Sequence, residues 1–204
     1  MMLRSTTFPL AGRRVQLRAL IPGDWDAWRE VRIRCRDWLV KWEPRPSAGH
    51  ADPAKDRRAF LARCSARERE RELGSGFGFG IFVEGRFCGE INLNSIQRGP
   101  FQNAYIGYWV DEAVAGNSYT PEAVAVMLRF GFEELGLHRV QISIIPRNRP
   151  SRRVVEKLDL RSEGVAVRYL EIDGTWEDHI RFAITAEEWY ERRDELTAAW
   201  IQAD

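Results

Sequence analysis

The stretch from residue 104 to residue 135 constrains the fold more than any other part of the sequence. It opens with β-forming residues, Ala104 to Val110, which predict a buried strand. A turn around Gly116 follows, and Thr120 predicts the N-cap of a long helix with Pro121 in its first turn. A turn that enters a helix N-terminus exposes unpaired backbone N–H groups. The stretch therefore predicts an anion site that suits a phosphate or a pyrophosphate.

Length and composition favour one globular unit. The chain has 204 residues, of which 44% are hydrophobic, so it can bury a substantial core, and we expect a single domain over residues 1–204. The formal net charge is +1, which gives no reason to expect binding to nucleic acid or to a membrane surface. The sequence contains neither a leader-like segment nor a stretch that suits a membrane span, so we expect a cytoplasmic protein.

The cysteines and histidines do not form a metal-ligand pattern. The cysteines are odd in number and far apart, which predicts free thiols in a reducing compartment. The histidines are also scattered, so we expect no metal site. The residues concerned are Cys35, Cys64, Cys88, His50, His138 and His179.

The rest of the chain alternates between strand and helix patterns. We expect strands at 13–20, 77–83, 87–93, 139–145, 165–172 and 177–184, and helices at 24–39, 53–72, 151–158 and 186–200. With the central strand and helix, this order predicts an α/β protein of the α+β type. Its mixed, mostly antiparallel central sheet would be covered by helices on both faces.

Tryptophans are concentrated in and after the first expected helix. Most of them favour a core position, because they fall mainly on one helical face. Trp38 and Trp42, which precede Glu43 and Pro44, leave two interpretations open: they belong to the core, or they line a substrate groove.

The sequence GYWVDEA, followed by AGNSYTPEAV and a helix, resembles the acetyl-CoA motif of the GNAT N-acetyltransferases, in particular of their RimJ/RimL branch. The loop of that branch usually begins Arg-Gly-x-Gly, whereas this chain has Ala115 at the arginine and Ser118 at the second glycine. The resemblance implies that backbone groups of the strand end bind the acetyl carbonyl and the pantetheine, and that the loop binds the pyrophosphate. The implied cofactor-binding residues are Trp109, Val110, Gly116, Asn117, Ser118, Tyr119 and Thr120.

A second motif, IPRNRPSRRVVEKLDL from Ile145 to Leu160, also resembles the RimJ/RimL pattern. The resemblance implies that Asn148 contacts the pantetheine arm and that Ser151 lies near the thioester sulfur as a general acid. From the residues alone, Ser151 equally predicts a helix N-cap. Four arginines crowd this turn, and we expect Arg153 among them to reach the phosphates of the cofactor. An exposed basic loop is the alternative.

Glu90 is the best candidate for the general base, because it lies among apolar residues on an expected central strand. A position on the solvent side of the strand is the alternative. Asp111 and Glu112 are closer to the loop but are typical of a turn. Weaker acid candidates are Tyr105, Tyr108 and Tyr119.

The resemblance covers nearly the whole chain and implies an enzyme that transfers an acetyl group from acetyl-CoA to a primary amine, without a metal. The implied acceptor is a protein N-terminal α-amine, such as that of a ribosomal protein. A small-molecule amine acetyltransferase is an open alternative. So is a degenerate GNAT-fold module that binds acyl-CoA or a partner without catalysis, because the loop departs from the usual pattern. Either a monomer or a homodimer is compatible with the sequence.

Overall fold

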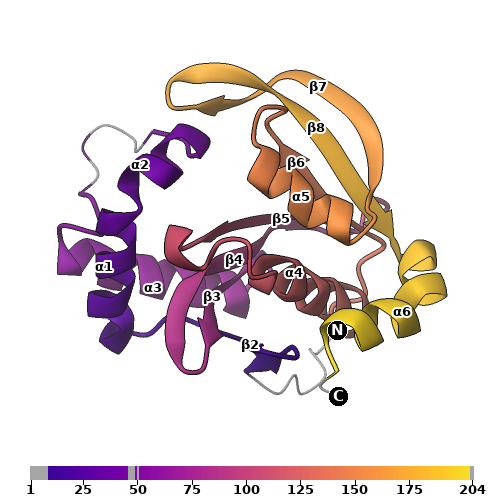
Figure 1. Ribbon diagram of the computed structural model, residues 1–204, viewed down its shortest axis with the longest axis horizontal. Helices are drawn as coiled ribbons and strands as arrows, with labels where there is room; N and C mark the ends of the chain where they lie inside the picture. Colours follow the sequence, from indigo (N-terminus) through magenta and orange to yellow (C-terminus); the bar gives the residue numbers. More distant parts are fainter. Residues whose placement is uncertain (1–8, 46–48, 50, 203–204) are drawn as a thin grey trace.

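The computed structural model describes residues 9–45, 49 and 51–202, and its strands form an eight-stranded sheet (Figure 1). The strands are β1 (Leu10–Ala11), β2 (Val15–Arg18), β3 (Phe77–Val83), β4 (Arg86–Gln97), β5 (Asn103–Val110), β6 (Arg139–Ile144), β7 (Arg161–Ile172) and β8 (Thr175–Thr185). Their order is β1-β2-β3-β4-β5-β6-β8-β7. Among these described strands, β5 and β6 pair in parallel and all other neighbours pair antiparallel. The predicted mixed, mostly antiparallel sheet is confirmed.

Helices cover both faces of this sheet. They are α1 (Trp25–Arg34), α2 (Arg36–Leu39), α3 (Arg57–Glu72), α4 (Tyr119–Arg129), α5 (Arg149–Lys157) and α6 (Ala186–Trp200). Ile91 of β4 packs in the same apolar cluster as α4, whereas the adjacent Glu90 contacts Trp28 of α1 and Arg63 of α3. Successive strand residues point to opposite faces, so α4 lies on one face and α1 and α3 lie on the other.

Helix α4 is at the centre of the core, and its residues from Thr120 to Leu128 are all buried. A π-helical segment, Phe130–Glu134, continues it. Phe130 packs edge-on against Phe77 of β3, with ring centroids 5.0 Å apart. Gly136, with a φ of 60°, adopts the left-handed conformation that ends a helix. The expected extent of the central helix is therefore confirmed, although its last part is wider than an α-helix.

Several expected boundaries near the N-terminal half are wrong. The first helix breaks at Cys35 into α1 and α2. Asp24 precedes α1 but does not cap it, because its carboxylate accepts a hydrogen bond from the Ile21 N–H at 2.8 Å. Helix α3 begins at Arg57, a few residues later than expected, because Asp56 supplies its N-cap.

The long β7–β8 hairpin reaches across the molecule toward α2 (Figure 1). Its two-residue turn, Asp173 and Gly174, has φ values of 47° and 80°, as a type I′ turn requires. At the tip, the Asp173 N–H donates to the Glu43 carbonyl at 3.0 Å, and Arg45 pairs with the Asp173 carboxylate at 2.9 Å. The hairpin tip is thus attached to the segment that follows α2.

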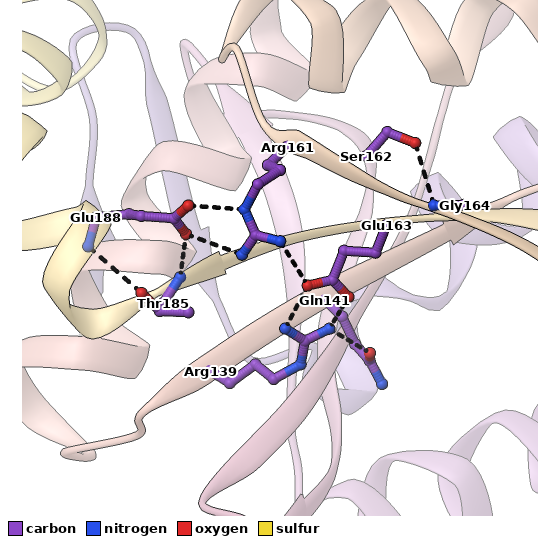
Figure 2. Close-up of polar contacts among 8 residues, drawn as sticks. All are labelled: Arg139, Gln141, Arg161, Ser162, Glu163, Gly164, Thr185 and Glu188. Atoms are coloured by element: carbon purple, nitrogen blue, oxygen red, sulfur yellow. Dashed lines mark hydrogen bonds and ion pairs between the residues drawn. The ribbon is translucent and has the colours of Figure 1, made fainter.

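A network of charged residues joins β6, β7 and α6 at the other end of the hairpin, and Figure 2 shows that Glu163 lies between two arginines. Arg139 and Arg161 each donate to the Glu163 carboxylate at 2.8 Å. Arg161 also donates to Glu188, which forms a capping box with Thr185 at the start of α6. The hydrogen bonds from Arg139 are the main cause that lowers the pKa of Glu163 to about 2.

We predict that Glu163 stabilises the fold in a pH-dependent manner. A carboxylate whose pKa is lowered on folding stabilises the folded state above the unfolded pKa of about 4.3, and this stabilisation is lost as the pH falls toward the folded pKa. Glu163→Gln should therefore lower the free energy of unfolding most near neutral pH, with a difference that shrinks toward pH 3. Urea titrations over this pH range measure the difference. Glu171→Gln, on the same strand, is the control, and a gap that does not change with pH would contradict the prediction.

Candidate functional site

The parallel pairing of β5 and β6 ends soon after it begins. Its register runs from Asn103 opposite Arg139 to Tyr105 opposite Gln141. Strand β5 continues to Val110 without this neighbour, so the backbone of its second half faces an opening between the two strands. Figure 1 shows α5 in this region, between β5 and the strands β6 and β8, and α4 on the other side of β5. In sheets with parallel strands, such openings at the carboxyl ends of strands are common ligand sites.

A groove with a cavity volume of about 1140 Å³ lies at this opening. Typical pockets for small molecules are about 300–1,000 Å³, so the groove has room for a large ligand and a second reactant. Most of the predicted site residues line it: Glu90, Trp109, Val110, Gly116, Ser118, Tyr119, Thr120, Asn148, Ser151 and Arg153. Asn117 does not. Its amide donates to the Val114 carbonyl at 3.0 Å, which shapes the loop.

The loop before α4 has the geometry of an anion site, although the expected cap is wrong. Gly116 and Ser118 have φ values of 89° and 63°, and α4 begins at Tyr119. Thr120 is therefore a buried residue of the first turn and not the N-cap. Ser118 occupies the N-cap position without a capping side-chain hydrogen bond. The N–H groups of Tyr119 and Thr120 precede the first bond of the helix, which the Glu122 N–H donates to the Ser118 carbonyl, so they remain available to an anionic ligand.

Helix α5 lines the same end of the groove with positively charged side chains. Arg149, Arg153 and Lys157 follow each other at four-residue spacing and all line the groove. The Lys157 ammonium donates to the Ser118 hydroxyl at 2.6 Å, so it lies directly at the loop. The sequence interpretation did not include Lys157 in the site, although its spacing from Arg149 and Arg153 was a usable signal. Lys157 therefore provides a positive charge at the loop, in which Ala115 stands at the position of the usual arginine.

Ser151 and Tyr108 form a hydrogen-bonded pair across the opening. The Ser151 hydroxyl donates to the Tyr108 oxygen at 3.1 Å, and the Tyr108 hydroxyl donates to the Ser151 carbonyl at 3.0 Å. Burial raises the pKa of Tyr108, so its hydroxyl stays protonated. The cap of α5 is Asn148, whose side chain accepts from the Ser151 N–H at 3.2 Å. The expected N-cap role of Ser151 is therefore wrong.

Glu90 is buried in the groove wall, with 2% of its surface exposed. The indole of Trp28 donates to one carboxylate oxygen at 2.5 Å, and Arg63 forms an ion pair with the other. Glu90 lies opposite Trp109 in the β4–β5 register, and the Arg32 guanidinium lies over the Trp109 ring at 5.0 Å. The alternative position on the solvent side of the strand is wrong. Both carboxylate oxygens are therefore paired with donors in the groove wall.

The aromatic residues after α1 also line the groove. Trp38 and Trp42 are both on its surface, as are Glu43 and Pro44, so the substrate-groove interpretation of this segment fits the structure. Glu43 holds Arg32 through two hydrogen bonds, of 2.6 and 2.7 Å, and its carbonyl accepts from the hairpin tip. This wall of the groove is therefore fixed from two sides.

The described residues contain no group of three or more His, Cys, Asp and Glu that could hold a metal ion. His50 lies outside the described residues. Cys35, Cys64 and Cys88 are free thiols. Within the described chain, no helix is both long and apolar enough to cross a membrane.

Residues 14–161 match the family model of the acetyltransferase (GNAT) domain. The chain belongs to the GNAT family and is an N-acetyltransferase. It is 31% identical over 170 residues to the ribosomal protein uS5-alanine N-acetyltransferase of Escherichia coli. The aligned residues cover 81% of this chain and 86% of that enzyme. Identity to the Bacillus subtilis protein YjcK is 42%, over 50% of this chain and only 56% of that protein.

The fold also matches that of a solved relative. The structure of Mycobacterium smegmatis RimJ in complex with CoA-disulfide superposes with a TM-score of 0.84 at 31% identity, over 93% of this chain and 91% of that one. The resemblance to RimJ-type acetyltransferases that the two motifs indicated is therefore confirmed. The structure of that relative contains a CoA species.

We predict that Lys157 contributes to cofactor affinity. Lys157→Gln removes the cation beside the loop but keeps a side chain that can contact Ser118. Loss of one charge-assisted hydrogen bond should weaken CoA binding roughly tenfold. Titration calorimetry measures the effect. Arg152→Gln is the matched control, because Arg152 donates to the Pro146 carbonyl and does not line the groove. Equal affinity of both variants would exclude Lys157 from the cofactor site.

Proposed function

We propose that this GNAT enzyme transfers the acetyl group of acetyl-CoA to the α-amine of a protein N-terminus. One observation carries the proposal: a single groove joins the anion-binding loop before α4 to the aromatic wall around Glu90. The volume of the groove leaves room for an acceptor beside a cofactor. The choice of acceptor is supported by the Escherichia coli relative, which is named for ribosomal protein uS5-alanine. A ribosomal acceptor would place the reaction in the cytoplasm.

The residues of the groove fit the chemical groups of acetyl-CoA. The first turn of α4 offers N–H groups to the pyrophosphate, together with Gly116 and Ser118 of the loop, and α5 offers Arg153 and Lys157. The unpaired edge of β5 at Trp109 and Val110 offers N–H and C=O groups to the amides of the pantetheine arm. Asn148 lines the groove beside them. When bound, acetyl-CoA supplies an activated acyl group on a thiol leaving group.

The two reactive ends of the groove suit the two proton transfers of an acyl transfer. The acceptor amine must lose a proton, and Glu90 is the carboxylate in the groove wall that would hold the amine and take this proton. The leaving sulfur must gain a proton, and the Ser151 hydroxyl, with Tyr108 behind it, would donate it. Proximity of the two reactants in one groove supplies much of the remaining rate.

The test of this proposal is a thiol-release assay with acetyl-CoA across a panel of acceptors. The panel contains short peptides with different first residues, the same peptides with blocked N-termini, and free polyamines and amino acids. We expect release only with open N-termini. Release with small amines alone would replace the proposed acceptor by a small molecule. No release with any acceptor, together with no CoA binding by calorimetry, would favour a degenerate binding module.

Glu90→Gln tests the general base. The change keeps the shape of the side chain and removes its basicity, so turnover should fall by roughly a hundredfold while CoA affinity stays nearly unchanged. Glu70→Gln serves as the control, because Glu70 pairs with Arg67 on α3 and does not line the groove. Parental turnover in Glu90→Gln would reassign the base.

Ser151→Ala tests the acid without disturbing the cap of α5. Because Asn148 is the N-cap, we expect Ser151→Ala to fold with nearly parental stability but to lose about ten- to a hundredfold in turnover. Tyr108→Phe should show a smaller loss, since it removes only the partner of the serine. Asn148→Ala removes the cap itself and should cost about 1 kcal/mol of stability. Urea unfolding and thiol release separate the two effects. Full activity of Ser151→Ala would exclude the serine as acid.

A further inference from the structure

The floor of the groove continues beyond the residues that acetyl transfer requires. Glu90, Asn92 and Asn94 alternate along β4, so their side chains share one face of the sheet, and all three line the groove. Across from them on β5 lie Trp109, Gly107 and Tyr105 in register. A polar track therefore leads away from Glu90 along the strand.

The two asparagines present donors to this track. Arg67 of α3 donates to Asn94 Oδ1 at 3.2 Å, which fixes the orientation of that amide. Its Nδ2 lies toward Gly107, 3.9 Å from the position that a Cβ would take there. Asn92 Oδ1 is buried beside Gly78 of β3 and has no hydrogen-bond partner among the described residues. The hydrogen bonds among the described residues include none donated by either NH₂ group.

The spacing of these donors matches an extended peptide. Residues two apart on a strand are about 6.6–7 Å apart, and carbonyl groups that point the same way in an extended peptide repeat at the same distance. The distance from Glu90 to Asn94 along the strand is about 13 Å, the length of about four extended residues. Gly107 keeps the space above the track open, because it has no side chain. A free amine of small size would use only the Glu90 end.

We propose that Asn92 and Asn94 bind main-chain carbonyl groups of the first residues of the acceptor. The enzyme then distinguishes an extended N-terminal tail from a small amine through the peptide backbone, with little dependence on side chains beyond the first residue. This proposal rests on the proposed function and names the specificity-determining residues of that acceptor site.

The test compares two acceptors with the same first residue, the one preferred in the peptide panel: a pentapeptide and the single amino-acid amide. We expect the parent to prefer the pentapeptide at least about tenfold in kcat/KM. Asn92→Ala and Asn94→Ala should each reduce that preference roughly threefold to tenfold, the effect of one lost hydrogen bond. Activity on the amide should stay nearly constant. Asn94→Asp keeps the shape and the Arg67 contact but removes the donor, so it should behave like Asn94→Ala.

Gln97→Ala is the matched control, because Gln97 is an exposed amide on β4 that does not line the groove. Two outcomes would overturn the role of Asn92 and Asn94 in binding the acceptor main chain and leave α-amine acetylation standing. Either the parent acetylates both acceptors equally, or the variants lose both activities together. If the parent acetylates neither acceptor, the proposed function fails. Binding of the peptide by Asn92 and Asn94 is then tested by the fluorescence anisotropy of a labelled pentapeptide in the presence of CoA. Weaker binding by the Asn92→Ala, Asn94→Ala double variant supports it, and equal binding overturns it.

Discussion

The divergence of β5 from β6 is the constraint on which the rest of the structure depends. Two parallel neighbours need a crossover connection, and here that connection is α4, which is buried along most of its length. Because both strands run in the same direction, the loop after β5 and helix α5, which follows β6, lie at the same end of the sheet. Lys157, the last residue of α5, therefore reaches Ser118 of the loop. The anion-binding end of the groove therefore follows from topology.

Buried carboxylates attach the outer elements to this frame. Glu122, in the first turn of α4, accepts hydrogen bonds from the Val15 N–H at 2.7 Å and from the Arg14 side chain at 3.0 Å, which ties β2 to the helix. Its charge also suits the positive end of the helix dipole. Glu90 does the same on the other face, where it joins α1 through Trp28 and α3 through Arg63. A buried charge is tolerated only with partners, so both carboxylates specify which elements must meet.

The sequence predicted elements well where periodicity and turn residues decide them. Strand β3 and helix α6 have the expected bounds, because alternation, glycine turns and a capping box are local signals. It failed where a tertiary contact decides the outcome. Thr120 is a good cap by type, but the left-handed turn at Ser118 starts α4 earlier, and Asn148 takes the cap that Ser151 also suits. Likewise, the helix breaks at Cys35, whose thiol contacts Asp111, 3.2 Å away and 76 positions further along the chain, and no local signal predicts this contact.

The two ends of the groove differ in whether their positively charged side chains are paired with carboxylates. At the α5 end, Arg153 and Lys157 face an anion-binding loop, so a polyanionic ligand is favoured there. At the other end, the arginines are already neutralised: Arg32 by Glu43 and Arg63 by Glu90. An acceptor at this end meets paired charges, aromatic rings and amides, and no strong net field. Selection of the acceptor then depends on hydrogen bonds and shape, which is the chemistry required to recognise a peptide main chain.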